Sequence, residues 1–302
     1  MDKIGVNFDA AVETIKNRLN AEPCILQYPI GKEDNFRGVI DIISMKAYTF
    51  DGSTDEKLFS IEIPDSLKPI VKRVRHKTIE QIASTDEKLL DKYLKEEEIS
   101  IPELKVALRK ATIACYLFPV FCGASFKNKG VKFLLDAIVD YLPSPLEVEP
   151  QKGEDQNGNP MVCKSEIDAP MIALIFKIAV DPFIGKLTFF RIYSGKIKSG
   201  SYVMNTNKGI KERIGRLIRM HANKRQEVEE AFAGDIVAAV GFKKSFTGQT
   251  ICSLGEKTIT LEKINVPEPV ISMSLEPATK ADQEKLSVSL NRLSEEDPTF
   301  RT

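Results

Sequence analysis

A polar, turn-rich stretch at residues 147–169, with GEDQNGNP at its centre, divides the sequence into two parts with different patterns. Before it, segments with apolar residues three or four apart alternate with short apolar runs, which is typical of an α/β arrangement. After it, short apolar segments are separated by glycine-containing turns, which is typical of a small antiparallel β-barrel. The sequence therefore predicts two or three domains, with a linker at 149–169.

Four helices are expected in the first part, within 6–20, within 65–95, from about residue 100, and within 128–142. Asn7 and Asn128 are expected to cap the first and last of these helices, because their side chains can accept free backbone N–H groups. Either Asp65 or Ser66 is expected to cap the second helix. Pro102 suits the first turn of the third helix, where a missing N–H costs nothing.

The predicted strands are short apolar runs. In the first part they are CILQYPI, GVIDIISMKAYTF and LFPVFCGAS, and the second run is expected to end at the turn Asp51-Gly52. In the second part they are MIALIFKIAV, KLTFFRIYSG, SYVM, ERIGRLIRM, DIVAAVGF and TICSL. From Pro267 a strand, VISMSL, and a helix at about 280–294 follow, and these two elements alone cannot bury a core. The chain is therefore expected to be cut within a third domain.

Composition excludes several classes of protein. Lysine plus arginine and aspartate plus glutamate number 43 each, so the net charge is zero and any RNA contact must come from local patches. The five cysteines form no C-x-x-C pair and there are only two histidines, which argues against a disulfide framework and against a metal site. No apolar run is long enough to cross a bilayer, and the N-terminus does not have the pattern of a secretory signal. A reducing compartment is expected, either the bacterial cytoplasm or an organelle matrix, with the mitochondrion favoured slightly.

Two segments resemble guanine-recognition motifs. Residues 1–5, MDKIG, resemble the end of the N-K-x-D motif of translational GTPases. The aspartate of that motif, here Asp2, accepts hydrogen bonds from N1–H and the amino group of guanine, which adenine cannot supply. Residues 122–130, CGASFKNKG, resemble the second guanine-contacting loop of the elongation factor G family, with the usual order Gly-Ser-Ala changed to Gly-Ala-Ser.

The resemblance implies that these two segments form a guanine site. Its expected residues are Asp2, Ala124, Ser125 and Phe126. A backbone N–H is expected to donate to guanine O6, with Ser125 as the first candidate donor and Ala124 as the second. Without the resemblance, Asp2 is a solvated charge near a terminus, and the loop is a helix N-terminus capped by Asn128.

Three long runs after the polar stretch also resemble the elongation factor G family. They are DPFIGKLTFFRIYSGKIKSG, RMHANKRQEVEEAFAGDIVAAVGF and PEPVISMSLEPATKADQEKLSVSLNRLSEEDPTF. The resemblance implies a multidomain α/β plus β chain: a truncated P-loop GTPase α/β domain with an α+β insert subdomain, a translation-factor β-barrel and a partial ferredoxin-like α+β domain. The implied boundaries are 1–23 and 113–148 for the C-terminal half of the G domain, 24–112 for the insert, 149–169 for the linker, 170–266 for domain II and 267–302 for the start of domain III.

The resemblance implies a factor for GTP-dependent ribosomal translocation of tRNA and mRNA. A paralogue devoted to ribosome recycling and a ribosomal-protection GTPase are alternatives. No G-x-x-x-x-G-K-[ST] segment occurs, although such a loop would hold the phosphates of GTP. The resemblance implies that the parent protein is a GTPase that uses GTP or GDP with Mg²⁺. This chain alone is expected to be an inactive ribosome-binding scaffold without catalytic residues, metal or cofactor.

The implied partners are small-subunit rRNA, through domain II, and the ribosomal stalk protein, through the insert, with neither a membrane nor DNA involved. The expected RNA-binding residues are Arg213, Arg216, Arg219, Lys224 and Arg225. Such residues supply sequence-independent affinity for phosphates. The alternative is an ordinary solvated strand face, and Glu227, Glu229 and Glu230 limit the size of the basic patch.

Overall fold

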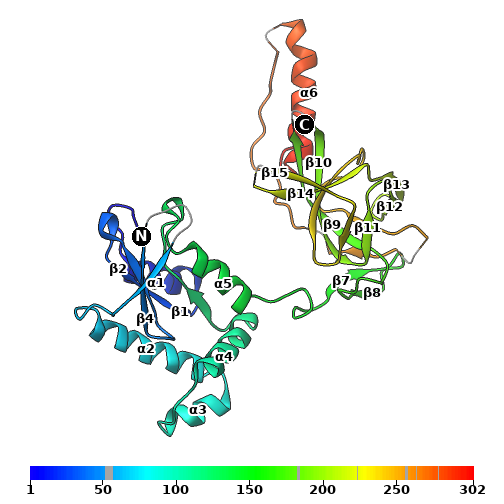
Figure 1. Ribbon diagram of the computed structural model, residues 1–302. Coiled ribbons are helices and arrows are strands. Elements are labelled where there is room, and N and C mark those ends of the chain that lie inside the picture. Colours follow the sequence, from blue (N-terminus) through cyan, green and yellow to red (C-terminus); the bar gives the residue numbers. More distant parts are fainter. Residues whose placement is uncertain (52–56, 182–183, 223, 256–257, 263, 278) are drawn as a thin grey trace. The chain divides into compact units, whose positions relative to one another are not determined.

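The computed structural model describes the chain except for residues 52–56, 182–183, 223, 256–257, 263 and 278 (Figure 1). The described residues form two compact units, Met1–Ser144 and Pro145–Thr302. The turn expected at Asp51-Gly52 extends into the first gap and so lies outside the described residues.

The first unit combines helices with two small sheets. Its elements are α1 (Phe8–Leu19), β1 (Pro23–Ile25), β2 (Gln27–Ile30), η1 (Glu33–Asn35), β3 (Gly38–Asp41), β4 (Lys46–Phe50), β5 (Leu58–Ile61), α2 (Lys68–Ala83), α3 (Glu87–Leu94), α4 (Ile101–Ile113), β6 (Phe118–Val120), η2 (Ser125–Lys127) and α5 (Val131–Tyr141). β1 and β6 pair in parallel, and the other strands form an antiparallel sheet in the order β2-β3-β4-β5. The predicted run CILQYPI is therefore divided between two sheets, and GVIDIISMKAYTF folds back on itself as β3 and β4.

Local capping chemistry accounts for the start of two helices. The Asn7 side chain accepts a hydrogen bond from the Ala10 N–H at 3.1 Å, which confirms the expected cap of α1. Ser100 and Glu103 form a capping box at the start of α4, since the Glu103 carboxylate accepts from the Ser100 N–H at 3.0 Å. Pro102 lies in the first turn of α4, as predicted.

Two other caps were predicted wrongly. α2 begins after Leu67 without a side-chain cap among the described residues, so neither Asp65 nor Ser66 caps it. α5 begins after Gly130, whose φ of 82° is a left-handed conformation that suits glycine. Asn128, the expected cap, instead ends the short helix η2, with a φ of 50°.

Two hydrophobic cores hold the first unit together. One core lies among α2, α3, α4 and β1, and Ile82, Leu104 and Leu108 are fully buried in it. The other lies on the sheet β2–β4 and also includes Cys122 and Ala124, which precede α5. The loop between β6 and α5 is thus anchored in a core at its first residues. The apolar stripe expected along α1 is only partly confirmed, because Phe8 is buried whereas Leu19 is 71% exposed.

The second unit consists mainly of antiparallel strands. Its elements are β7 (Gln151–Glu154), β8 (Pro160–Cys163), β9 (Ile172–Asp181), β10 (Gly185–Ser194), β11 (Lys196–Lys198), β12 (Tyr202–Asn205), β13 (Ile210–Arg213), β14 (Arg216–His221), β15 (Lys224–Val228), β16 (Glu230–Phe232), β17 (Ile236–Val240), β18 (Thr250–Cys252), β19 (Thr260–Leu261) and α6 (Lys280–Glu296). The main sheet has the order β13-β12-β18-β9-β10-β17-β14-β15. Val203 of β12 and Leu217 of β14 come from near opposite ends of this order, yet they share one buried core with Ile175 of β9. The sheet therefore curls around that core, as a barrel does.

Two segments of the second unit differ from expectation. The stretch expected to be a linker contains β7 and β8, which form a three-stranded sheet with β19. The strand predicted at VISMSL is absent, because the described residues 264–277 contain no strand. The predicted helix that follows is present as α6, capped by Thr279, and its residue Glu295 lies 3.4 Å from the Lys186 ammonium on β10.

Candidate functional site

The structure brings together the two segments expected to recognise guanine. The Met1 α-amino group donates to the Gly123 carbonyl oxygen at 2.8 Å. Asp2 Oδ2 lies 3.8 Å from Lys127 Nζ, and the Asp2 side chain is 18% exposed. Asp2 is therefore held beside the loop 122–130 and is not a fully solvated charge near a terminus.

A narrow bridge gives the loop its shape. The Ala124 N–H donates to the Lys129 carbonyl at 2.9 Å, and the Lys129 N–H donates back to the Ala124 carbonyl at 3.0 Å. Gly123 lies so close to this bridge that an added Cβ would meet the Lys129 oxygen at 2.7 Å. Only glycine therefore fits at this position without a shift of the backbone.

The bridge leaves two backbone donors available in the loop. Among the described residues, the N–H groups of Ser125 and Phe126 donate to no other group, because they open the short helix η2. The Ala124 N–H is already used in the bridge, so Ala124 does not fit the expected role of a direct donor. The Phe126 side chain is 99% exposed. Three of the four expected residues, Asp2, Ser125 and Phe126, therefore present groups that a base could contact.

A third segment, residues 31–36, contacts both of the others, and no motif in the sequence had pointed to it. Its Glu33 bonds to residues 1–5, and its Phe36 carbonyl accepts from Lys129. These contacts join residues 28 and 93 positions apart, so no local spacing could have indicated them.

Around this loop, the described residues hold a thiol but no cluster of metal ligands. No set of three or more His, Cys, Asp or Glu side chains in the described part of the chain is arranged to bind a metal ion. The nearby thiol of Cys122 is buried, which raises its pKa to about 12, so it stays protonated at neutral pH.

The five residues expected to bind RNA do not share one surface. In the hairpin β14–β15, Met220 pairs with Arg225 and His221 pairs with Lys224. Because side chains alternate along a strand, Arg216 and Arg225 lie on one face of the hairpin, whereas Arg219 and Lys224 lie on the other. Three of the five are also paired with carboxylates: Arg216 with Glu227 at 2.8 Å, Arg219 with Asp235 at 3.3 Å, and Arg225 with Asp181.

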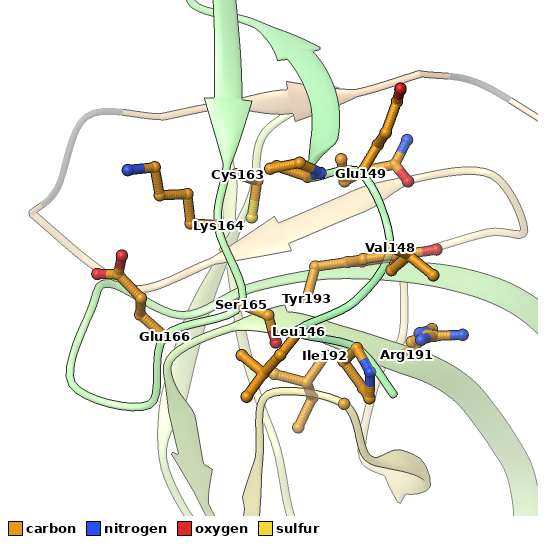
Figure 2. A pocket seen from close by; sticks show the side chains of 14 residues that line it. Leu146, Val148, Glu149, Cys163, Lys164, Ser165, Glu166, Arg191, Ile192 and Tyr193 are labelled. Atoms are coloured by element: carbon orange, nitrogen blue, oxygen red, sulfur yellow. The ribbon is translucent and has the colours of Figure 1, made fainter. Parts of the chain in front are cut away.

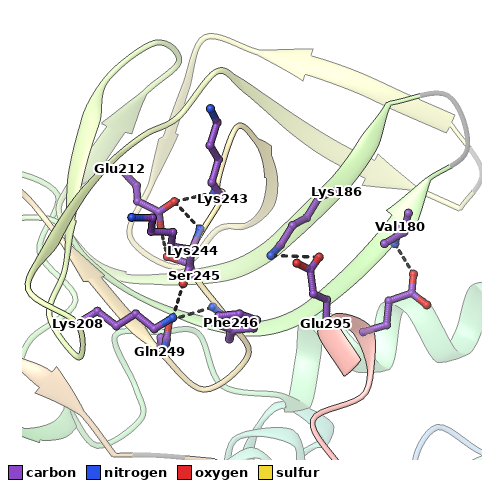
Figure 3. A network of polar contacts seen from close by, with 11 residues as sticks. Val180, Lys186, Lys208, Glu212, Lys243, Lys244, Ser245, Phe246, Gln249 and Glu295 are labelled. Atoms are coloured by element: carbon purple, nitrogen blue, oxygen red, sulfur yellow. Dashed lines mark hydrogen bonds and ion pairs between the residues drawn. The ribbon is translucent and has the colours of Figure 1, made fainter. Parts of the chain in front are cut away.

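A second basic region surrounds Phe246 (Figure 3). Lys208 Nζ lies 4.1 Å and Lys186 Nζ lies 5.0 Å from the centroid of the Phe246 ring, both within the range of a cation–π contact. We call residues 243–246, with the sequence Lys-Lys-Ser-Phe, the lysine loop. Both of its lysines, Lys243 and Lys244, are exposed.

Glu212 of β13 holds the lysine loop in place. Its carboxylate accepts hydrogen bonds from the N–H groups of Lys243 and Lys244, at 2.7 and 3.0 Å, and from the Ser245 hydroxyl (Figure 3). Burial of Glu212 opposes its ionisation, but these hydrogen bonds, with that from Ser245 the strongest, outweigh burial and lower its pKa below the ordinary value. The lysine loop is thus fixed by a carboxylate beneath it, while its lysines stay exposed.

A cleft of about 500 Å³ lies within the second unit (Figure 2). Figure 2 shows Lys164 and Glu166 on one side of it and Arg191 on the other. Its one thiol, Cys163, is buried, which raises its pKa to about 11 and makes it a poor nucleophile at neutral pH. Arg191 stacks on the Tyr193 ring, with 5.3 Å between the guanidinium carbon and the ring centroid. Cys163 is therefore not suited to act as a nucleophile in this cleft. Within the described residues, no helix is both long and apolar enough to cross a membrane.

Comparisons with known proteins agree with this architecture. Residues 185–252 match the family model described as Elongation factor Tu domain 2, and residues 266–302 match that described as Elongation Factor G, domain III. All 302 residues align with the curated Elongation factor G of Mycoplasma pneumoniae at 49% identity. A crystal structure of a Thermus thermophilus protein superposes on 98% of the chain, with a TM-score of 0.76 and 30% identity.

Both matched models describe domains of translation elongation factors. Over its whole length the chain is homologous to elongation factor G, as the sequence predicted. The chain spans 44% of the curated relative and 41% of the solved Thermus chain.

Proposed function

We propose that these residues belong to a GTP-dependent factor that moves tRNA and mRNA through the ribosome. The observation that carries the proposal is the contact between residues 1–5 and the loop 122–130, because it would bring together the two segments of a guanine site. The parent protein would be a GTPase, and GTP or GDP with Mg²⁺ would be its nucleotide.

Guanine recognition would divide between the two segments. The Asp2 carboxylate would accept from N1–H and the amino group of guanine, while the N–H groups of Ser125 and Phe126 would donate to O6. Adenine presents an amino group where guanine has O6 and has no hydrogen at N1, so it would leave these groups without partners. The loss of these hydrogen bonds would disfavour the binding of adenine.

The chain alone would bind to the ribosome without hydrolysing GTP. Phosphoryl transfer depends on groups that position the γ-phosphate and stabilise its charge. The 302 residues hold no G-x-x-x-x-G-K-[ST] loop that could do this. In the proposed arrangement, residues 1–23 and 113–148 belong to the G domain and 24–112 to its insert.

Ribosomal RNA would contact the second unit through phosphates, and the stalk protein would contact the insert. Of the two basic regions, the lysine loop offers the better phosphate site. The arginines of β14 and β15 are paired with carboxylates, whereas Lys243 and Lys244 are exposed in the same loop as Phe246, whose ring lies under Lys208 and Lys186. Lysines that flank an aromatic side chain are a frequent arrangement in RNA-binding surfaces. For the compartment, the Mycoplasma relative favours the bacterial cytoplasm, and the mitochondrial preference has no support.

Co-sedimentation with ribosomes tests the ribosome-binding part of the proposal. The 302-residue chain should pellet with ribosomes at about 0.1 M salt, where phosphate contacts are still strong. An excess of Mycoplasma elongation factor G should displace it. A chain that remains in the supernatant, or that pellets equally with and without the competitor, would contradict the proposal.

A further inference from the structure

A short segment of the first unit lies between the two parts of the candidate guanine site. It begins at Gly31 and ends at Phe36, and it includes η1. Glu33, in η1, has a φ of 56°, a left-handed conformation that is uncommon for a residue with a side chain. Such a conformation persists where surrounding contacts fix it, and it is found often at functional sites.

Glu33 forms two hydrogen bonds with the Asp2 segment, residues 1–5. The Glu33 N–H donates to the Met1 carbonyl at 2.9 Å, and the Gly5 N–H donates to Glu33 Oε1 at 2.8 Å. These two bonds flank Asp2, one residue before it and three residues after it. Together they fix the backbone from which the Asp2 carboxylate projects.

Residues 31–36 also contact the second guanine-contacting loop, residues 122–130. Lys129 Nζ donates to the Phe36 carbonyl at 2.6 Å, and Lys129 is the residue that forms the bridge with Ala124. Phe36 is 1% exposed and shares a core with Cys122 and Ala124. Residues 31–36 therefore connect the Asp2 segment to the loop that carries the Ser125 and Phe126 donors.

We propose that Glu33 is a positioning residue for guanine recognition. It holds the Asp2 carboxylate at a fixed distance from the Ser125 and Phe126 N–H groups, so that one base can contact all of them at once. Fixing both partners before binding removes much of the entropy cost of ordering them around the ligand. This inference rests on the guanine site proposed above, and it assigns to the insert a part in choosing the base.

The chemistry of the Gly5 contact separates this role from a general effect of charge. Gly5 needs an acceptor at Oε1, and a glutamine side chain provides one without a charge. Glu33→Gln should therefore retain the hydrogen bond from the Gly5 N–H, whereas Glu33→Ala should lose it. Asp34→Ala is the matched control, because Asp34 is an exposed neighbour in the same short helix and its removal makes the same change in charge.

The experiment is a titration of the ¹⁵N-labelled 302-residue chain and its three variants with GMP, IMP and AMP, followed by amide shifts of Gly5, Ser125 and Phe126. In the wild type, GMP should shift these amides at millimolar concentrations and AMP should not. Glu33→Ala should raise the apparent dissociation constant for GMP about tenfold, of the order expected when one positioning hydrogen bond is lost. It should also reduce the preference for GMP over IMP, which lacks the amino group that Asp2 accepts from. Glu33→Gln and Asp34→Ala should stay within about twofold of the wild type.

Two different results would overturn the inference, and they can be distinguished. If Glu33→Ala responds to GMP and IMP as the wild type does, the guanine site stands and Glu33 has no part in positioning it. If the wild type itself shows no difference between GMP and AMP, the guanine site fails and the role of Glu33 fails with it. A purely structural role for Glu33 would lower the melting temperature of Glu33→Ala while leaving the ratio of GMP to IMP affinity unchanged, and this also counts against the proposal.

Discussion

The Ala124 N–H donates to the Lys129 carbonyl oxygen at 2.9 Å, and this hydrogen bond, with the one that returns from the Lys129 N–H, closes the loop that presents the Ser125 and Phe126 donors. The loop is narrow because Gly123 lies directly against the Lys129 carbonyl. The bridge and the glycine together determine which N–H groups are used within the loop and which remain available.

Substitution of Gly123 by alanine should therefore distort the loop. The new Cβ would lie 2.7 Å from the Lys129 oxygen, a backbone atom that cannot move independently. Overpacking of this kind typically costs about 1–3 kcal/mol, so Gly123→Ala should lower the stability of the first unit by that amount. Urea unfolding measures it, with the second unit serving as an internal control. Equal stability of the variant and the wild type would show that the loop is not so tightly closed.

The carboxylate of Glu212 makes the second unit sensitive to acid. Its pKa is lowered in the folded chain, so its contribution to stability is complete above the unfolded value, about 4.3, and is lost as the pH falls through the folded value. Glu212→Gln should be less stable than the wild type at pH 6, and it should lose less stability on acidification. Urea unfolding at pH 6 and at low pH, followed through signals from β12 and β13, checks both differences. The same dependence on pH in both proteins would contradict the assigned role.

Lysines of the lysine loop should contribute more to RNA binding than the arginines of the neighbouring hairpin. Replacing both Lys243 and Lys244 by alanine leaves their backbone N–H groups bonded to Glu212 and removes two exposed charges. Affinity for small ribosomal subunits should fall, and the slope of log K against log salt should decrease by about 1–2. Arg216→Ala is the control, and it should change little because Arg216 is already paired with Glu227. A larger effect of Arg216→Ala would indicate that RNA contacts β14 and β15 rather than the lysine loop.

The isolated chain should not hydrolyse GTP. The sequence contains no P-loop, which is the segment that would hold the phosphates of GTP during hydrolysis. Multiple-turnover assays with and without ribosomes measure this directly, with a preparation from cells that do not express the chain as the control for contamination. Turnover above that control would show that phosphate-binding groups exist outside the known motif.

Parts of the structure that depend on neighbouring residues were predictable from the sequence. The cap at Asn7 and the place of Pro102 in the first turn of α4 require only the residues of one helical turn, and the sequence identified both. Most strands of the curled sheet were also evident, because apolar runs between glycine-containing turns show locally which segments can form strands, whereas the polar strand β15 was missed.

Parts that depend on distant residues were not predictable. Asn128 looked like a helix cap, but it ends η2 within the loop closed by the bridge between Ala124 and Lys129, and Gly130 takes the N-cap position of α5 instead. The run VISMSL has the composition of a strand, yet a strand needs a partner, and Val270 is 98% exposed. In the candidate site, Asp2 and Ser125 were found through family motifs, whereas Glu33 was missed because its contact with Gly5 spans 28 residues.

The central claim is that Asp2 and the open N–H groups of η2 form the base-recognition half of a nucleotide site. The most direct test is an amide-shift titration of the wild-type chain with GMP and AMP, with Asp2→Asn and Ser125→Pro compared alongside. Proline at 125 removes one donor at the first position of η2, where a missing N–H breaks no bond within the helix, and Ser125→Ala keeps that donor as a control. The account predicts weak, millimolar binding of GMP without binding of AMP, together with loss of the GMP response in Asp2→Asn and Ser125→Pro but not in Ser125→Ala. Equal responses to GMP and AMP, or a GMP response that survives in Asp2→Asn, would contradict it.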